Sequence, residues 1–147
     1  MRAFRFQQRF EQSREEIFAF MTDLSRAPRW RSLVRHIEVE GGGRVRQGSV
    51  LLLTLDVGGK TMQVPSEVVV YEPPQRYVHR NITNGVEMIF EYCLETDGNG
   101  SIVRLNGDLR PYGLMWLFLP FIWSTFSSRY RGQLAALKRA MEIPVKI

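Results

Sequence analysis

Apolar residues recur at steps of three and four along the last part of the chain, between Tyr112 and Met141. This spacing keeps one side of a 3.6-residue helix apolar for about seven turns. The pattern predicts one long C-terminal helix whose apolar side needs a broad partner. The apolar positions of this side are Trp116, Leu119, Trp123, Phe126, Tyr130, Leu134, Leu137 and Met141.

Upstream of this helix, apolar and polar residues alternate, which is typical of strands with one buried face. The first such segment, residues 3–11, carries Phe4, Phe6 and Phe10 on one side. Six further segments end at glycine, proline, Asn-Gly or Asp-Gly turns, which favour hairpins. These segments are Val34–Glu40, Gly48–Val57, Lys60–Glu72, Arg76–Thr83, Val86–Thr96 and Ser101–Arg110.

Two short helices are predicted between the first and second strands. Ser13 and Glu16 have the spacing of a capping box, which opens a helix that runs to Asp23. Pro28 breaks this helix and begins a second short turn near Trp30. The order of elements predicts one α+β domain over residues 1–147, with about seven antiparallel strands.

The alternation also assigns faces to the strands. In the segment 86–96 the even positions are apolar and the odd positions carry glutamates, so the even positions are expected to point inward. In the segment 76–83 we favour the odd positions as the inward ones. The inward residues of these two segments are Met88, Phe90, Tyr92, Leu94, Tyr77, His79 and Asn81.

Composition narrows the class of protein. The 147 residues carry a net charge of +5, but the basic residues are scattered and form no nucleic-acid motif, so no nucleic-acid partner is expected. Cys93 is the only cysteine and the chain has two histidines, which excludes an internal disulfide and disfavours a zinc site. We expect no metal and no cofactor. The first residues lack the apolar core of a secretion signal, so a cytoplasmic location is expected.

Three phrases carry a resemblance to a known family. They are residues 13–23 followed by Trp30, the run from Glu67 through Pro73-Pro74 to Tyr77, and the run Leu134–Glu142. In this order the chain resembles the START-like helix-grip (SRPBCC) superfamily, specifically the polyketide cyclase/dehydrase and lipid transport group. The resemblance implies a curved antiparallel sheet wrapped around the C-terminal helix, with an apolar cavity between them. It implies no general catalytic motif.

Three residues are candidates for acid–base chemistry. His79 titrates near neutral pH and would act as an acid or base if it faces the cavity, although a strand histidine is more often hydrogen-bonded to a neighbour. Glu67, like Asp56, would be a buried base if it points inward and a surface ion-pair partner if it does not. Tyr130 lies on the helix stripe, where its ring packs and its hydroxyl reaches the cavity.

A hydrophobic ligand would contact the residues that face the space between the sheet and the helix. A pocket of this kind is mostly apolar with few polar groups, but the sequence does not show whether a void remains. The candidate ligand-binding residues are Tyr77, His79, Asn81, Met88, Phe90, Tyr92, Trp116, Leu119, Trp123, Phe126 and Tyr130.

The first half of the long helix has a surplus of apolar residues. No charged residue occurs between Arg110 and Arg129, yet Pro120 and the serines after it argue against a membrane span. Pro120 marks either a kink or the first turn of the long helix proper. The region 114–122 is therefore a candidate for a cavity entrance, a homodimer contact or a peripheral membrane contact.

These observations leave three hypotheses for function. The first is binding or carriage of a hydrophobic small molecule, such as a lipid, a polyketide or another aromatic compound. The second is an enzyme of the polyketide cyclase/dehydratase type that uses the same cavity. The third is an interaction protein that docks a partner or a membrane surface through the apolar outer face of the C-terminal helix. The sequence contains no nucleotide loop or nucleophile elbow, and turnover stays an open question.

Overall fold

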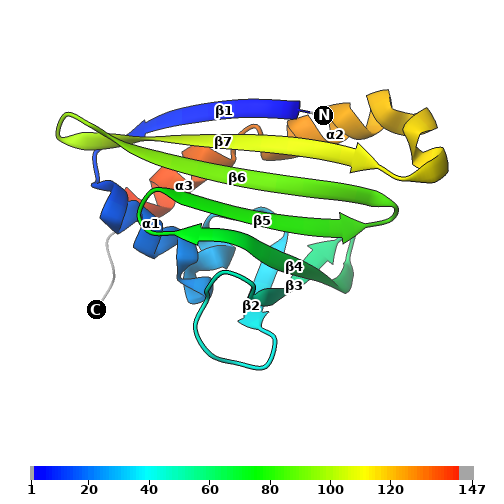
Figure 1. The fold of residues 1–147 in the computed structure, drawn as a ribbon, viewed down its shortest axis with the longest axis horizontal. Coiled ribbons are helices and arrows are strands. Elements are labelled where there is room, and N and C mark those ends of the chain that lie inside the picture. The colour runs from blue at the N-terminus through cyan, green and yellow to red at the C-terminus, as the bar shows by residue number, and fades with distance from the viewer. Residues whose placement is uncertain (1, 143–147) are drawn as a thin grey trace.

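The computed structural model describes residues 2–142, which form a seven-stranded antiparallel sheet with helices packed against one face (Figure 1). The strands are β1 Arg2–Phe10, β2 Val34–Val39, β3 Val50–Val57, β4 Lys60–Glu72, β5 Arg76–Thr83, β6 Val86–Asp97 and β7 Gly100–Pro111. The helices are α1 Arg14–Thr22, η1 Leu24–Arg29, η2 Gly113–Phe118, α2 Leu119–Tyr130 and α3 Gln133–Glu142, of which η1 and η2 are 3-10 helices. The predicted α+β order of elements is confirmed.

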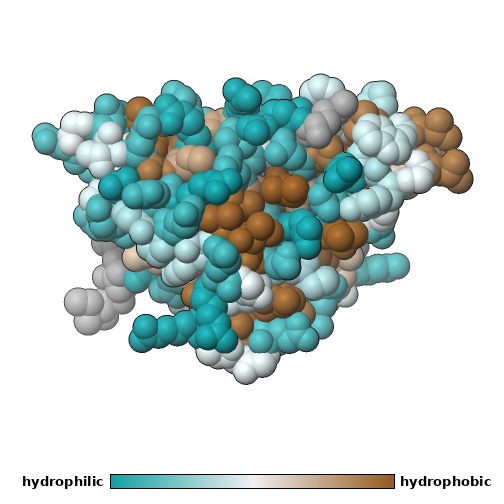
Figure 2. All heavy atoms as spheres, viewed as in Figure 1, coloured by the Kyte–Doolittle hydropathy of each residue, from teal (hydrophilic) through white to brown (hydrophobic). Residues whose placement is uncertain are grey.

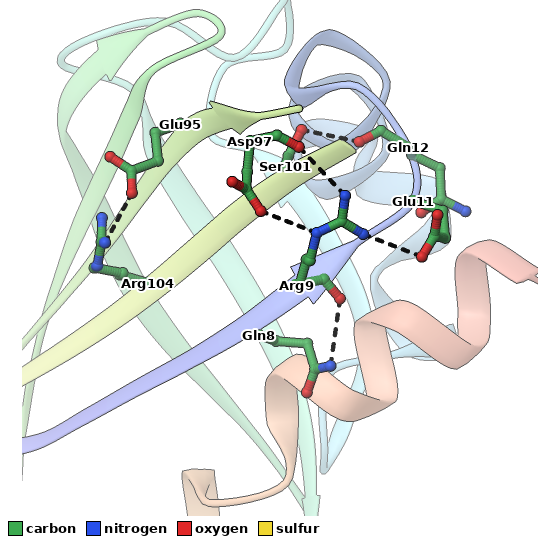
Figure 3. Close-up of polar contacts among 8 residues, drawn as sticks. All are labelled: Gln8, Arg9, Glu11, Gln12, Glu95, Asp97, Ser101 and Arg104. Atoms are coloured by element: carbon green, nitrogen blue, oxygen red, sulfur yellow. Dashed lines mark hydrogen bonds and ion pairs between the residues drawn. The ribbon is translucent and has the colours of Figure 1, made fainter. Parts of the chain in front are cut away.

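Strands that follow one another from β2 to β7 are neighbours in the sheet, and β1 closes the other edge beside β7. The guanidinium of Arg9 holds this edge together, with Nε 2.9 Å from Asp97 Oδ2 and Nη1 3.1 Å from Glu11 Oε1 (Figure 3). The hydroxyl of Ser101 also donates to the Gln12 carbonyl at 2.9 Å. These contacts tie the start of the chain to the β6–β7 hairpin.

The aromatic face of β1 depends on a glycine in β7. Gly107 pairs with Phe4, and a Cβ atom at Gly107 would lie 2.3 Å from Phe4 Cζ. The missing side chain lets the Phe4 ring lie flat on β7, where it stacks on Phe6 with 4.9 Å between ring centroids.

The hairpin and capping signals behave as predicted. Asn84 and Gly85 take positive φ angles of 53° and 78° between β5 and β6, as an Asn-Gly turn requires. Ser13 caps α1, because its hydroxyl oxygen accepts from the backbone N–H of Glu16 at 3.2 Å.

The apolar stripe predicted one long helix from Tyr112 to Met141, with Pro120 either at a kink or in the first turn of the helix proper. The structure shows the second alternative for Pro120, and the helical segment is interrupted. A 3-10 turn precedes α2, which has Pro120 in its first turn, and Gly132 separates α2 from α3. Proline is well suited to the first turn of a helix, since the backbone donor that it lacks has no intrahelical partner there. The interruption changes which residues face the sheet, and the stripe predicted for one continuous helix faces the interior only from Phe126 onward.

Candidate functional site

The space between the sheet and the helices is lined by aromatic rings. Phe90 of β6 lies at the centre, with ring centroids 4.8 Å from Tyr130 and 5.4 Å from Phe126 on α2. On the other side of Phe90, the imidazole of His79 stacks at 4.7 Å with 20° between the planes. The inward faces predicted for β5 and β6 are therefore confirmed.

A cluster of buried polar side chains, called the polar group below, lies at the η1 end of this aromatic row, where His79 and Tyr77 of β5 meet Tyr92 of β6. Nδ1 of His79 lies 3.3 Å from Ser66 Oγ on β4, and both side chains are buried. The hydroxyl of Tyr92 accepts from Gln133 Nε2 at 2.7 Å, which links the sheet to the first turn of α3. Asn81 is buried two residues beyond His79.

Arg31 brings a positive charge to this group. It follows η1, is half-buried, and lines a small interior pocket together with Trp30. No carboxylate forms an ion pair with Arg31 among residues 2–142. The pocket is lined by Met21, Leu24, Ala27, Trp30, Arg31, Ile37, Tyr77, His79 and Tyr92.

Burial and the Arg31 charge set the ionisation of the polar group. Burial is the main cause that lowers the pKa of His79 well below its usual 6.5, and the Arg31 charge adds to it. Burial also raises the pKa of Tyr77 and of Tyr92 to about 12, although Arg31 opposes this shift. At neutral pH the site therefore presents a neutral imidazole, two neutral phenols and one cation.

The pocket itself is very small. Its volume is about 10 Å³, which is room for about one water molecule. Trp30 is almost fully buried, and no residue that the structure describes accepts a hydrogen bond from its Nε1. The pocket is thus rich in hydrogen-bond donors and large enough for one acceptor atom, while a whole ligand would need the helices and sheet to separate.

Tyr130, Phe126 and Met88 take the positions expected of interior residues. Phe126 is buried, and Tyr130 and Met88 are partly buried against the core. Burial raises the pKa of Tyr130 above its usual 10. These residues lie at the α2 end of the aromatic row, on the far side of Phe90 from the polar group.

The two acidic candidates do not face the interior. Glu67 is partly exposed and accepts from Arg80 Nη2 at 2.8 Å, and Asp56 is exposed with Arg35 3.9 Å away. Both carboxylates belong to the ion-paired outer surface, which is the surface alternative that the sequence left open for them, so Glu67 is not a buried base.

Three helix residues predicted to line the cavity lie elsewhere. Trp116 is 50% exposed because it belongs to η2 and not to a continuous helix. Trp123 lies against the edge strand, where its Nε1 donates to the Ala3 carbonyl at 2.6 Å, and Leu119 is partly exposed. The stripe begins to face the interior only near Phe126, ten residues after its predicted start at Trp116 and therefore almost three helical turns later.

A much larger hollow lies outside the interior. It has a volume of about 580 Å³ and is formed by the loop between β2 and β3, from Val39 to Val50. Its lining residues are largely exposed glycines and the arginines Arg44 and Arg46. None of the predicted site residues lies there, so we place the candidate site at the buried polar group and not at this larger surface hollow.

Sequence reasoning missed four residues of the polar group: Arg31, Trp30, Ser66 and Gln133. Trp30 was noted only as part of a family phrase, and Arg31 looked like one more surface arginine. The inward alternation of β4 could have pointed to Ser66, because Val64, Ser66 and Val68 are buried on one side of that strand. No sequence signal marks Gln133.

Two other kinds of feature are absent from the described part of the chain. Within residues 2–142, no group of three or more histidine, cysteine, aspartate or glutamate side chains has the arrangement of a metal site. No helix in that range is both long and apolar enough to cross a membrane.

Comparison with known proteins places this geometry in context. The sequence profile of a family described as polyketide cyclase/dehydrase and lipid transport matches residues 1–142. No curated protein matches the sequence.

Solved structures share the fold at low sequence identity. Ara h 8.0201 has a TM-score of 0.75 at 15% identity, covering 95% of this chain and 97% of its own. The protein TTHA0849 from Thermus thermophilus has a TM-score of 0.72 at 14% identity, covering 92% of this chain and 94% of its own. The di-domain ARO/CYC protein StfQ from the steffimycin biosynthetic pathway has a TM-score of 0.73 at 12% identity, with 95% of this chain matching 50% of that one. These similarities confirm the helix-grip arrangement predicted from the sequence.

Proposed function

Because the chain belongs to the polyketide cyclase/dehydrase and lipid transport family, we propose that it binds and carries a hydrophobic small molecule between its sheet and its helices. The observation that carries this proposal is the aromatic interior that ends at a donor-rich pocket beside an arginine without a carboxylate partner among the described residues. A row of rings suits the apolar or aromatic body of a ligand, and the pocket suits one oxygen atom at its end.

The chemistry of the pocket favours a ligand with an acceptor oxygen, such as a carbonyl, phenolate or carboxylate. Arg31 supplies only donors, Trp30 has a buried donor without an acceptor in residues 2–142, and the phenols of Tyr77 and Tyr92 stay protonated at neutral pH. A ligand oxygen in this place would satisfy donors of this pocket, which favours binding.

Binding requires the interior to open, because the pocket holds about 10 Å³. The segment of η1 that carries Ala27 and leads to Trp30 and Arg31 covers the pocket and packs on β2. This cover consists of short elements, so it is the part of the enclosure that we expect to move when a ligand enters.

The test uses Trp30 as the reporter. Titration with fatty acids, sterols and polyaromatic acids should change tryptophan emission with a one-to-one end point, and the change should vanish in Trp30→Phe. Trp116 and Trp123 serve as internal controls, since both lie away from the pocket. Native mass spectrometry of the purified protein checks the same proposal by detecting a bound apolar molecule. If neither method detects any ligand across these classes, carriage is wrong.

A second candidate is a cyclase-type enzyme at the same site, favoured by the approach of a cation, an imidazole and two phenols. Arg31 and the phenols would stabilise an enolate oxygen, and His79 would take the proton. The lowered pKa of His79 makes it a weak base, which is why carriage comes first. The test is to incubate a polyketide-type ligand with each protein and analyse the released compound. If the wild type changes its carbon skeleton and His79→Ala does not, the cyclase-type enzyme becomes the first candidate.

A further inference from the structure

One end of the molecule carries a group of large apolar side chains that nothing in the described chain covers. Figure 2 shows apolar atoms gathered on the projection at the right, where Figure 1 places the start of α2. The exposed fractions reach 79% for Leu114, 76% for Leu117 and 74% for Phe121. We call this group the apolar tip, and its members are Leu114, Trp116, Leu117, Phe118 and Phe121.

The apolar tip stands on a well-anchored base. The hydroxyl of Tyr112 donates to Glu87 Oε2 at 2.9 Å, and the backbone N–H of Tyr112 donates to the Gly85 carbonyl at 2.8 Å. Met115 points the other way and packs against the core beside Gly85. One residue of η2 therefore fills the interior while its neighbours are directed outward, so the exposure of the tip follows from the way the turn is fixed.

The charged residues in the segment of sequence that contains the tip have one sign. Between positions 109 and 141 the sequence has five basic residues and no acidic one. Two carboxylates lie on the adjacent strands: Glu87 accepts a hydrogen bond from the Tyr112 hydroxyl, and Asp108 forms an ion pair with Arg2 at 2.8 Å. Arg110 and Arg129 are exposed on either side of the apolar segment. An uncovered apolar tip with basic flanks matches a surface that is apolar inside and negatively charged outside.

We infer that the apolar tip inserts into the outer layer of an anionic lipid membrane, with Arg110 and Arg129 at the level of the lipid headgroups. Side chains of Leu and Phe enter the acyl boundary, and a half-exposed tryptophan such as Trp116 suits the interface. Anionic lipid adds attraction for each arginine close to the surface.

A second copy of the chain fits the tip less well. A two-fold contact brings the same patch together from both molecules, so the basic flanks of one copy would face those of the other. The segment offers no acidic residue to pair with them. Like charges brought together in this way oppose association.

The experiment is flotation of the whole protein with vesicles of phosphatidylcholine plus phosphatidylserine, and with vesicles of phosphatidylcholine alone. We expect the wild type to float with the anionic vesicles and to be released by salt, since part of the attraction is electrostatic. The double variant Leu117→Ser, Phe121→Ser should bind at least tenfold more weakly, because two large side chains lose their insertion. Val69→Ser, an exposed apolar residue of β4, is the matched control and should bind like the wild type.

Sizing chromatography across a range of protein concentrations shows whether the tip binds a second copy of the chain instead of a membrane. A monomer that floats with anionic vesicles supports the inference. Equal flotation of the wild type and the double variant would overturn it, as would the absence of vesicle binding. A dimer that the double variant loses, without any flotation, would assign the tip to a second copy. Vesicle binding needs no interior ligand, so a negative result here leaves carriage untouched.

Discussion

Nδ1 of His79 on β5 lies 3.3 Å from Ser66 Oγ on β4, in a part of the interior where both side chains are buried. A neutral hydroxyl is the side-chain partner of this nitrogen. Within residues 2–142 no carboxylate compensates a positive charge on the imidazole, and Arg31 opposes one. The folded protein therefore holds His79 in its neutral form, which gives the site a measurable dependence on pH.

The first prediction concerns stability in mild acid. The pKa of His79 is well below 6.5 in the folded state, so below about pH 6.5 the unfolded chain binds a proton that the folded chain does not. Stability is fully present above that pH and should fall as the pH decreases, by up to about 1.4 kcal/mol per pH unit, until the folded-state pKa is reached. Urea unfolding of the wild type and of His79→Gln at several pH values measures the difference. Parallel pH profiles for the two proteins would show that His79 is not held neutral.

The second prediction concerns the close contact between Gly107 and Phe4. Gly107→Ala places a methyl group where the Phe4 ring lies, and overpacking of this kind costs about 1–3 kcal/mol. Chemical denaturation measures the loss. The double variant Phe4→Leu, Gly107→Ala should lose less stability than the sum of the losses in the two single variants, because the smaller side chain removes the clash. Additive losses would mean that the two residues do not compete for the same space.

The third prediction contrasts two phenylalanines in the C-terminal segment. Phe126 is 6% exposed among the rings of Phe4, Phe90 and Tyr130, so Phe126→Ala should cost about 3–5 kcal/mol.

Phe118 is the matched partner, because it is 56% exposed. Phe118→Ser should change the free energy of unfolding by no more than about 0.5 kcal/mol. Thermal or urea unfolding of both variants decides the matter. Large and similar losses would show that the tip is part of the folded core.

The fourth prediction rests on the proposed carriage and concerns Arg31. If the Arg31 guanidinium donates a hydrogen bond to an oxygen of the ligand, the wild type should bind an aromatic carboxylic acid more tightly than its methyl ester. Arg31→Gln should reduce that preference about tenfold or more, since a hydrogen bond to a charged group contributes about 1.5–3 kcal/mol. Arg35→Gln is the control, because Arg35 is exposed and lies near Asp56. An unchanged ratio in Arg31→Gln would remove Arg31 from the site.

The strands and their faces could be read from the sequence because alternation and turn chemistry are local. Phe90 and Tyr92 point inward as the pattern of β6 required, and the Asn-Gly pair at 84–85 forms the predicted turn with two positive φ angles. The same locality explains the errors on the helix side. The periodicity around Trp116 is compatible with a helix, but the chain makes a 3-10 turn there before Pro120 begins α2.

The polar group was only half predictable. His79 and Asn81 were found because they share a strand face, whereas Arg31 and Gln133 come from turns and helix starts that tertiary packing brings to that face. For Glu67 the sequence left two interpretations open, because an acid within an apolar strand can point to either side, and Arg80 on the neighbouring strand holds it outside. The near absence of a void is a property of packing that no local pattern encodes.

The pairing of β1 with β7 also determines the order of events when the chain is made. The Arg9–Asp97 contact joins residues 88 positions apart, so β1 leaves the ribosome well before β7, the strand that it pairs with. At usual rates of translation those positions take roughly 4–18 s to synthesise. During that interval the phenylalanines of β1 lack the strand that they pack on in the folded protein, so we expect the apolar side of β1 to be transiently exposed during synthesis.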